Sequence, residues 1–91
     1  MTDSAHQAQI HLSSDEAIVL FELLSRWTDD KGAATPGRGC FESRAECAVL
    51  HGILAHLEKQ LVAPFREDYP ETVDGARARL AQGWDGATLR G

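Results

Sequence analysis

Large apolar side chains recur between Ser43 and Val62 with the spacing of an α-helix. Their positions are three or four residues apart, so at 3.6 residues per turn they share one side of the helix. They are Cys47, Leu50, Leu54, Leu57 and Leu61. This spacing is typical of a helix packed nearly parallel or antiparallel to another helix. Ser43 and Glu46 have the spacing of a capping box, and Pro64 predicts the end of the helix.

The opposite side of the same predicted helix carries almost no side chain. Small residues occupy it, namely Ala45, Ala48, Gly52 and Ala55. A glycine inside a helix costs roughly 1 kcal/mol relative to alanine, so a close packing partner is one interpretation of Gly52. The alternative is that alanine is simply a good helix former and that this side lies in water.

A second amphipathic stretch predicts a helix from about Ser14 to Thr28 or Asp29. Ser13 and Glu16 form a possible capping box before it. One face is the expected core stripe, made of Ala17, Leu20, Phe21, Leu24 and Trp27. The apolar side chains of Ile18 and Val19 lie on the other side of this helix.

The apolar positions outside the two core stripes predict a second contact surface. We expect it to consist of Ile18, Val19, Ala45, Ala48, Gly52 and Ala55. Such a surface could receive a later helix of the same chain, a second copy of the chain or a foreign protein partner.

The remaining segments complete an all-α prediction. Residues 29–41 are rich in Gly and Pro and predict a loop, and Pro70 and Gly83 bracket a weakly amphipathic third helix over about 71–82. We therefore expect a small three-helix domain over residues 10–84, built on an antiparallel helical hairpin with the third helix across it. Residues 1–9 and 85–91 are expected to be flexible tails.

Composition and charge narrow the classes of partner. The chain has 91 residues, and its nine Lys and Arg against 14 Asp and Glu give a net charge of −5. This balance repels a phosphate backbone, so nucleic-acid binding is disfavoured. It suits a basic protein partner, although acidity also serves solubility alone. No run approaches the roughly 20 apolar residues that span a membrane, and the polar start lacks an export signal, so we expect a cytoplasmic protein.

Three residues could carry metal chemistry. Cys47 and His51 are one helical turn apart, and Cys40 lies seven residues before Cys47 in the loop. Thiolate and imidazole are zinc ligands, but the paired Cys-x-x-Cys spacing of structural zinc sites is missing. Cys47 also begins the leucine stripe, where a buried thiol behaves as a small apolar group. We expect no metal, no cofactor and no catalytic residue.

The favoured hypothesis is a non-enzymatic protein-binding module, such as an inhibitor, an immunity or antitoxin-like protein, or an adaptor. One alternative is a metal-binding sensor or enzyme that uses Cys40, Cys47 and His51. Another alternative is a structural homodimer.

The segment SSDEAIVLFELLSRW resembles the opening of a group of short, uncharacterised bacterial proteins. That group has a D-E-A-x-x-L-F-E-x-L-x-R-W pattern, then a Gly-rich or acidic loop and a second helix that ends near L-x-x-P-F. The matching positions are Asp15, Glu16, Ala17, Leu20, Phe21, Glu22, Leu24, Arg26, Trp27, Leu61, Pro64 and Phe65. The resemblance implies a helix–loop–helix–helix plan and a bacterial origin, and it transfers no activity and no site.

Overall fold

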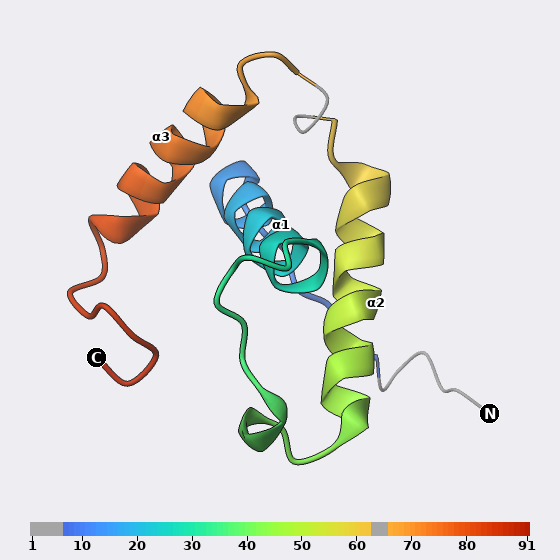
Figure 1. Ribbon diagram of the computed structural model, residues 1–91. Helices are drawn as coiled ribbons and strands as arrows, with labels where there is room; N and C mark the ends of the chain where they lie inside the picture. The colour runs from blue at the N-terminus through green and yellow to red at the C-terminus, as the bar shows by residue number, and fades with distance from the viewer. Residues whose placement is uncertain (1–6, 63–65) are drawn as a thin grey trace.

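The computed structural model describes residues 7–62 and 66–91, and within these ranges the chain is helical with no strand. Its elements are α1 (Ser14–Asp29), the short 3-10 helix η2 (Arg38–Cys40), α2 (Arg44–Gln60) and α3 (Tyr69–Ala81). Helix α1 lies between the other two helices, with α2 on one side and α3 on the other (Figure 1). The prediction of a small all-α fold is confirmed.

The N-terminus of α1 is capped as the sequence predicts. The Ser13 hydroxyl accepts a hydrogen bond from the Glu16 backbone N–H at 3.1 Å, and the Glu16 carboxylate accepts one from the Ser13 N–H at 2.8 Å. These two bonds satisfy N–H groups that have no partner within the helix.

Helix α2 has a different cap from the one predicted. The Ser43 hydroxyl accepts from the Ala45 N–H at 3.0 Å, whereas the Glu46 carboxylate accepts from the Glu42 N–H at 3.0 Å. The predicted capping box is therefore wrong, because the Glu46 carboxylate binds the backbone N–H of Glu42 and not that of Ser43. The helix ends at Gln60, and the predicted stop at Pro64 lies outside the described residues.

Helices α1 and α2 form the antiparallel hairpin. Ala17 near the start of α1 and Leu57 near the end of α2 line one groove. Trp27 and Cys47 line a cavity at the opposite end of the pair. The buried centre consists of Leu24, Leu54 and Leu57, and the predicted stripes of both helices surround it through Ala17, Leu20, Phe21, Trp27, Leu50 and Leu61.

Helix α3 crosses the other side of α1 (Figure 1). Ile18, Val73 and Ala76 form a small buried cluster, in which Ala76 has no exposed surface. Polar contacts flank it: Arg79 pairs with Asp15, and the Tyr69 hydroxyl donates to the Glu22 carboxylate at 2.6 Å. The helix begins two residues earlier than predicted, with Pro70 in its first turn, where the missing N–H costs no helical hydrogen bond.

The predicted tails are described in part. Residues 1–6 lie outside the described residues, and residues 7–13 have no regular secondary structure. The chain after α3 consists of turns, bends and irregular backbone.

Candidate functional site

Within the described residues, no other helix covers the side of α2 that points away from α1. Ala45, Ala48, Gly52 and Ala55 are all exposed, and a Cβ atom added at Gly52 would meet no other heavy atom within 4 Å. Helix α3 does not lie here, because it packs on α1 (Figure 1). We define the outer face of α2 as the exposed residues Ala45, Ala48, Val49, Gly52, Ile53 and Ala55.

The structure separates the six residues that the sequence grouped into one contact surface. Ile18 is only 3 % exposed because Val73 and Ala76 of α3 cover it, and Val19 packs at the edge of the same cluster. These two residues therefore belong to the internal contact between α1 and α3. The four small residues of α2 remain open to solvent.

The outer face carries two larger apolar side chains besides its small residues. Val49 is 60 % exposed and Ile53 is 37 % exposed. The stretch from Cys47 to Leu57 contains no Asp, Glu, Lys or Arg. An exposed apolar surface of this kind is typical of a protein contact site, whereas an ordinary solvent-facing helix side carries charges.

An apolar groove adjoins the outer face. It has a volume of about 390 Å³, and its walls come from the segment before α1, from α1 and from α2. Ile10 and Leu12 line it from the first segment, Leu20 from α1, and Ile53 and Leu57 from α2. Ile53 belongs to both, so the groove continues directly from the outer face, and the polar side chains of His11, His56 and Gln60 complete its lining.

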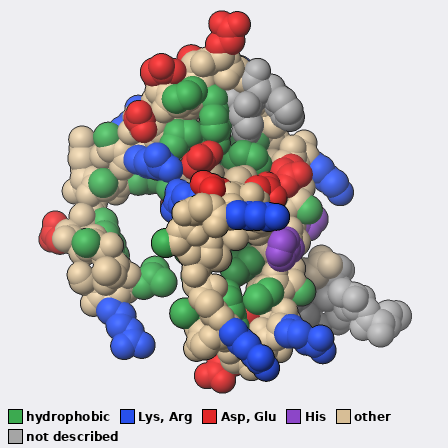
Figure 2. All heavy atoms as spheres, viewed as in Figure 1, with side chains coloured by type: hydrophobic (Ala, Val, Ile, Leu, Met, Phe, Trp, Pro, Cys, Tyr) green, Lys and Arg blue, Asp and Glu red, His purple; other side chains and the backbone are tan. Residues whose placement is uncertain are grey.

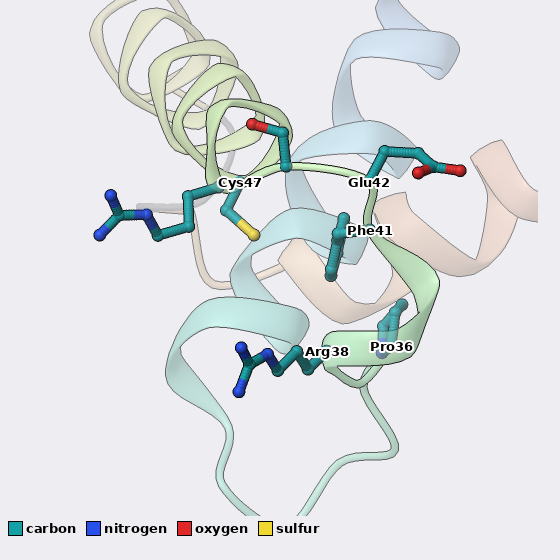
Figure 3. Close-up of a pocket in the computed structure, with 7 residues that line it drawn as sticks. Pro36, Arg38, Phe41, Glu42 and Cys47 are labelled. Carbon is teal, nitrogen blue, oxygen red and sulfur yellow. The ribbon is translucent and has the colours of Figure 1, made fainter.

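The loop between α1 and α2 forms two further cavities around Cys47. The larger has a volume of about 460 Å³ and is lined by Pro36, Arg38, Phe41, Glu42, Ser43, Arg44 and Cys47. In Figure 3, Cys47 points from α2 toward this space, which Phe41 and Arg38 border from the loop. The smaller cavity has a volume of about 150 Å³, and Trp27 and His51 are among its lining residues.

The structure brings together two of the three candidate metal ligands. Cys47 and His51 line the smaller cavity, whereas Cys40 lies exposed in η2 and lines neither cavity. Both cysteines are free thiols. Within the described residues, no group of three or more His, Cys, Asp or Glu side chains is arranged to hold a metal ion.

Acidic side chains gather away from the outer face of α2. In Figure 2 several of them lie at the top of the molecule, over the segment that leads into α3. Glu67, Asp68 and Glu71 are exposed there. Other acidic side chains lie across the centre of the same view, and Glu46 and Glu58 are exposed on α2 itself.

The sequence did not predict the polar contacts between α3 and α1, which join Arg79 to Asp15 and Tyr69 to Glu22. The two hydrogen bonds from Arg79 lower the pKa of the Asp15 carboxyl, and the same contact raises the pKa of the Arg79 guanidinium. Burial, followed by the hydrogen bond to the Glu22 carboxylate, raises the pKa of Tyr69. The only signal in the sequence was opposite charge, because acidic residues lie in the first turn of α1 and a basic residue lies in the last turn of α3.

Comparisons with models of protein families, with curated proteins and with solved structures found no match to this chain. Among the described residues, no helix is both long enough and apolar enough to cross a bilayer. Interpretation of the site therefore rests on its own geometry.

Proposed function

We propose that this chain is a non-enzymatic protein-binding module, in the class of inhibitors, immunity or antitoxin-like proteins and adaptors. Its docking surface is the outer face of α2 together with the adjoining groove. The observation that carries the proposal is the exposure of the apolar side chains of Val49 and Ile53 in a stretch that holds the exposed His51 and His56 but no Asp, Glu, Lys or Arg. Exposed apolar surface is lost from water when a partner covers it, and this drives association.

The surroundings of this surface support a protein partner rather than a nucleic acid. A nucleic acid is recognised by Lys and Arg that neutralise its phosphates, and the stretch from Cys47 to Leu57 contains neither residue. The net charge of −5 opposes phosphate binding as well. The proposal includes a cytoplasmic setting, which suits two free thiols.

The metal-dependent alternative has less support. Cys47 and His51 line one cavity, but Cys40 does not line it, and two protein ligands fall short of the three or four that zinc sites use.

Affinity capture in the native host tests the proposal. Two differently tagged copies of the chain are expressed there, and proteins captured by the wild type are compared with those captured by Val49→Glu. A charge in the middle of the docking surface should remove the partner, whether this is another protein or the second tagged copy. Leu89→Glu introduces the same charge at a side chain that is 98 % exposed near the chain end, and it should leave capture unchanged. Capture of the same proteins by wild type and Val49→Glu would contradict the proposal.

A further inference from the structure

We infer that the two cavities around Cys47 form one binding site for a small aromatic carboxylate. Three residues line both cavities, namely Pro36, Phe41 and Cys47, so the two spaces adjoin along these side chains. The site lies between the loop that joins α1 to α2 and the start of α2. It is separate from the outer face of α2, so this inference goes beyond the proposed function and does not depend on it.

The smaller cavity has the size and the walls for an aromatic ring. Its volume is about 150 Å³, and an apolar cavity of about this volume in another protein binds benzene. Its walls include large apolar side chains from both helices and from the loop, namely Leu24, Trp27, Phe41 and Leu50. Leu24 is only 1 % exposed, so the cavity extends to the buried centre between α1 and α2.

Most of the polar side chains that line the smaller cavity are already paired or in contact with water. The Thr28 hydroxyl donates to the Leu24 carbonyl at 2.8 Å, and the Thr35 hydroxyl donates to the Ala33 carbonyl at 3.2 Å. His51 is exposed. The part of a ligand that enters this cavity is therefore expected to be apolar.

The larger cavity supplies positive charge. Arg38 from η2 and Arg44 from the first turn of α2 both line it, and both are exposed. Among the described residues, the arginines held in ion pairs are Arg77 and Arg79. Within that part of the chain, Arg38 and Arg44 are therefore available to an anionic group. A guanidinium is planar, and its N–H groups match the two oxygens of a carboxylate.

One carboxylate of the chain also lines the larger cavity. In Figure 3 the Glu42 side chain points away from Cys47 and Arg38. The two arginines outnumber this single acid, whereas the chain as a whole has a net charge of −5. A ligand with one negative charge suits this balance better than a doubly charged phosphate, which the rest of the chain repels more strongly.

The apolar and charged walls border one space. In Figure 3, Cys47 and Phe41 lie on one side of it, and Arg38 and Pro36 lie on the other. The larger cavity has a volume of about 460 Å³, which is within the usual range of ligand pockets. Such pockets combine apolar walls with a few polar groups that orient the ligand. The ring of the ligand therefore occupies the smaller cavity, and its carboxylate lies between Arg38 and Arg44.

Fluorescence titration of the full chain with phenylacetate tests the inference. The chain has two tryptophans, so Trp84→Phe leaves Trp27, which lines the smaller cavity, as the only reporter. The emission of Trp27 should change saturably, with a dissociation constant in the micromolar to millimolar range, because so small a ligand makes few contacts. Acetate lacks the ring and phenethyl alcohol lacks the charge, so each should bind about tenfold more weakly or worse.

Variants of the charged wall test the position of the carboxylate. Arg38→Gln and Arg44→Gln should each weaken phenylacetate binding about tenfold and leave phenethyl alcohol binding unchanged, because the alcohol forms no ion pair. Arg90→Gln removes the same charge at an exposed residue that lines neither cavity, and it should leave phenylacetate binding unchanged. Equal losses in all three variants would overturn the inference, because net charge alone would then explain them.

A pair of variants at the junction of the cavities tests the position of the ring. Cys47→Leu fills the junction and should abolish the saturable change, whereas Cys47→Ser keeps the size of the side chain and should retain it. Circular dichroism checks that both variants keep wild-type helicity. Unchanged binding by folded Cys47→Leu, or no saturable change in the chain that carries Trp84→Phe alone, would overturn the inference. The proposed function is decided separately by host capture with Val49→Glu.

Discussion

Arg79 in the last turn of α3 donates two hydrogen bonds to the Asp15 carboxylate in the first turn of α1. Its Nε lies 2.7 Å from one carboxylate oxygen and its Nη2 lies 2.8 Å from the other. Bidentate geometry of this kind fixes orientation as well as distance. The contact therefore joins the end of α3 to the start of α1.

This ion pair should make the stability of the fold depend on pH at the acid end. The folded state lowers the pKa of Asp15, so the stabilisation is complete above the usual carboxyl pKa of about 3.9 and is lost as the pH falls through the folded value. Asp15→Asn should lower the melting temperature slightly at neutral pH, because exposed pairs contribute little. The difference from wild type should vanish in strong acid. A difference that persists in acid would contradict this account.

Tyr69 should titrate at a higher pH than a free tyrosine. The chain contains one tyrosine, so a spectrophotometric titration follows this side chain alone. Burial and the Glu22 carboxylate raise its pKa, so tyrosinate should appear only above the ordinary value of about 10. Folding favours the neutral phenol, and its stabilising contribution is therefore complete below pH ~10 and is lost at higher pH.

Glu22→Gln provides the matched variant for that titration. The amide keeps a hydrogen-bond acceptor but removes the negative charge, so the pKa of Tyr69 should fall toward 10 without reaching it, because burial remains. An unchanged titration curve would show that Glu22 does not contact the phenol.

The crossing of α1 and α3 should tolerate no extra volume. Ala76 has no exposed surface and lies against Ile18 and Val73. Ala76→Leu should reduce the free energy of unfolding by about 1–3 kcal/mol, the usual cost of overpacking a core. Ala78→Leu adds the same side chain at an exposed position of α3 and should change it by no more than about 0.5 kcal/mol. Chemical denaturation of both variants measures the difference, and equal stabilities would contradict the packing described.

The local elements of this fold could be predicted from the sequence because their signals are local. Helix α1 follows from the Ser13–Glu16 capping box and from a stripe of one apolar residue per turn. The leucines of α2 predicted its contact with α1 for the same reason. The cap of α2 was predicted less well, because the Glu46 carboxylate can reach either of two neighbouring N–H groups and takes that of Glu42.

The position of α3 could not be predicted, because the chain offers it two apolar surfaces. One contains Ile18 and Val19, and the other is the small-residue side of α2. Burying a branched aliphatic side chain removes more apolar area from water than burying an alanine, so the α1 side is favoured. The bond between Tyr69 and Glu22 adds to this preference, and it joins residues 47 positions apart, which no local pattern reveals.

Four of the six residues of the predicted contact surface are exposed. These are Ala45, Ala48, Gly52 and Ala55, whereas Ile18 and Val19 pack against α3. Val49 and Ile53 were missed because they flank the leucine stripe, and only the packed structure shows how much of each remains exposed.

The most direct measurement of the central claim is a pair of two-dimensional amide NMR spectra of the full chain, recorded before and after addition of the protein that the chain captures in its host. Binding at the outer face of α2 predicts that the signals of Ala48, Val49 and Gly52 shift when this protein is added. The signals of Val73 and Ala76 in α3 should stay in place and serve as the internal control. Shifts confined to α3, or spectra that are identical with and without that protein, would contradict the account.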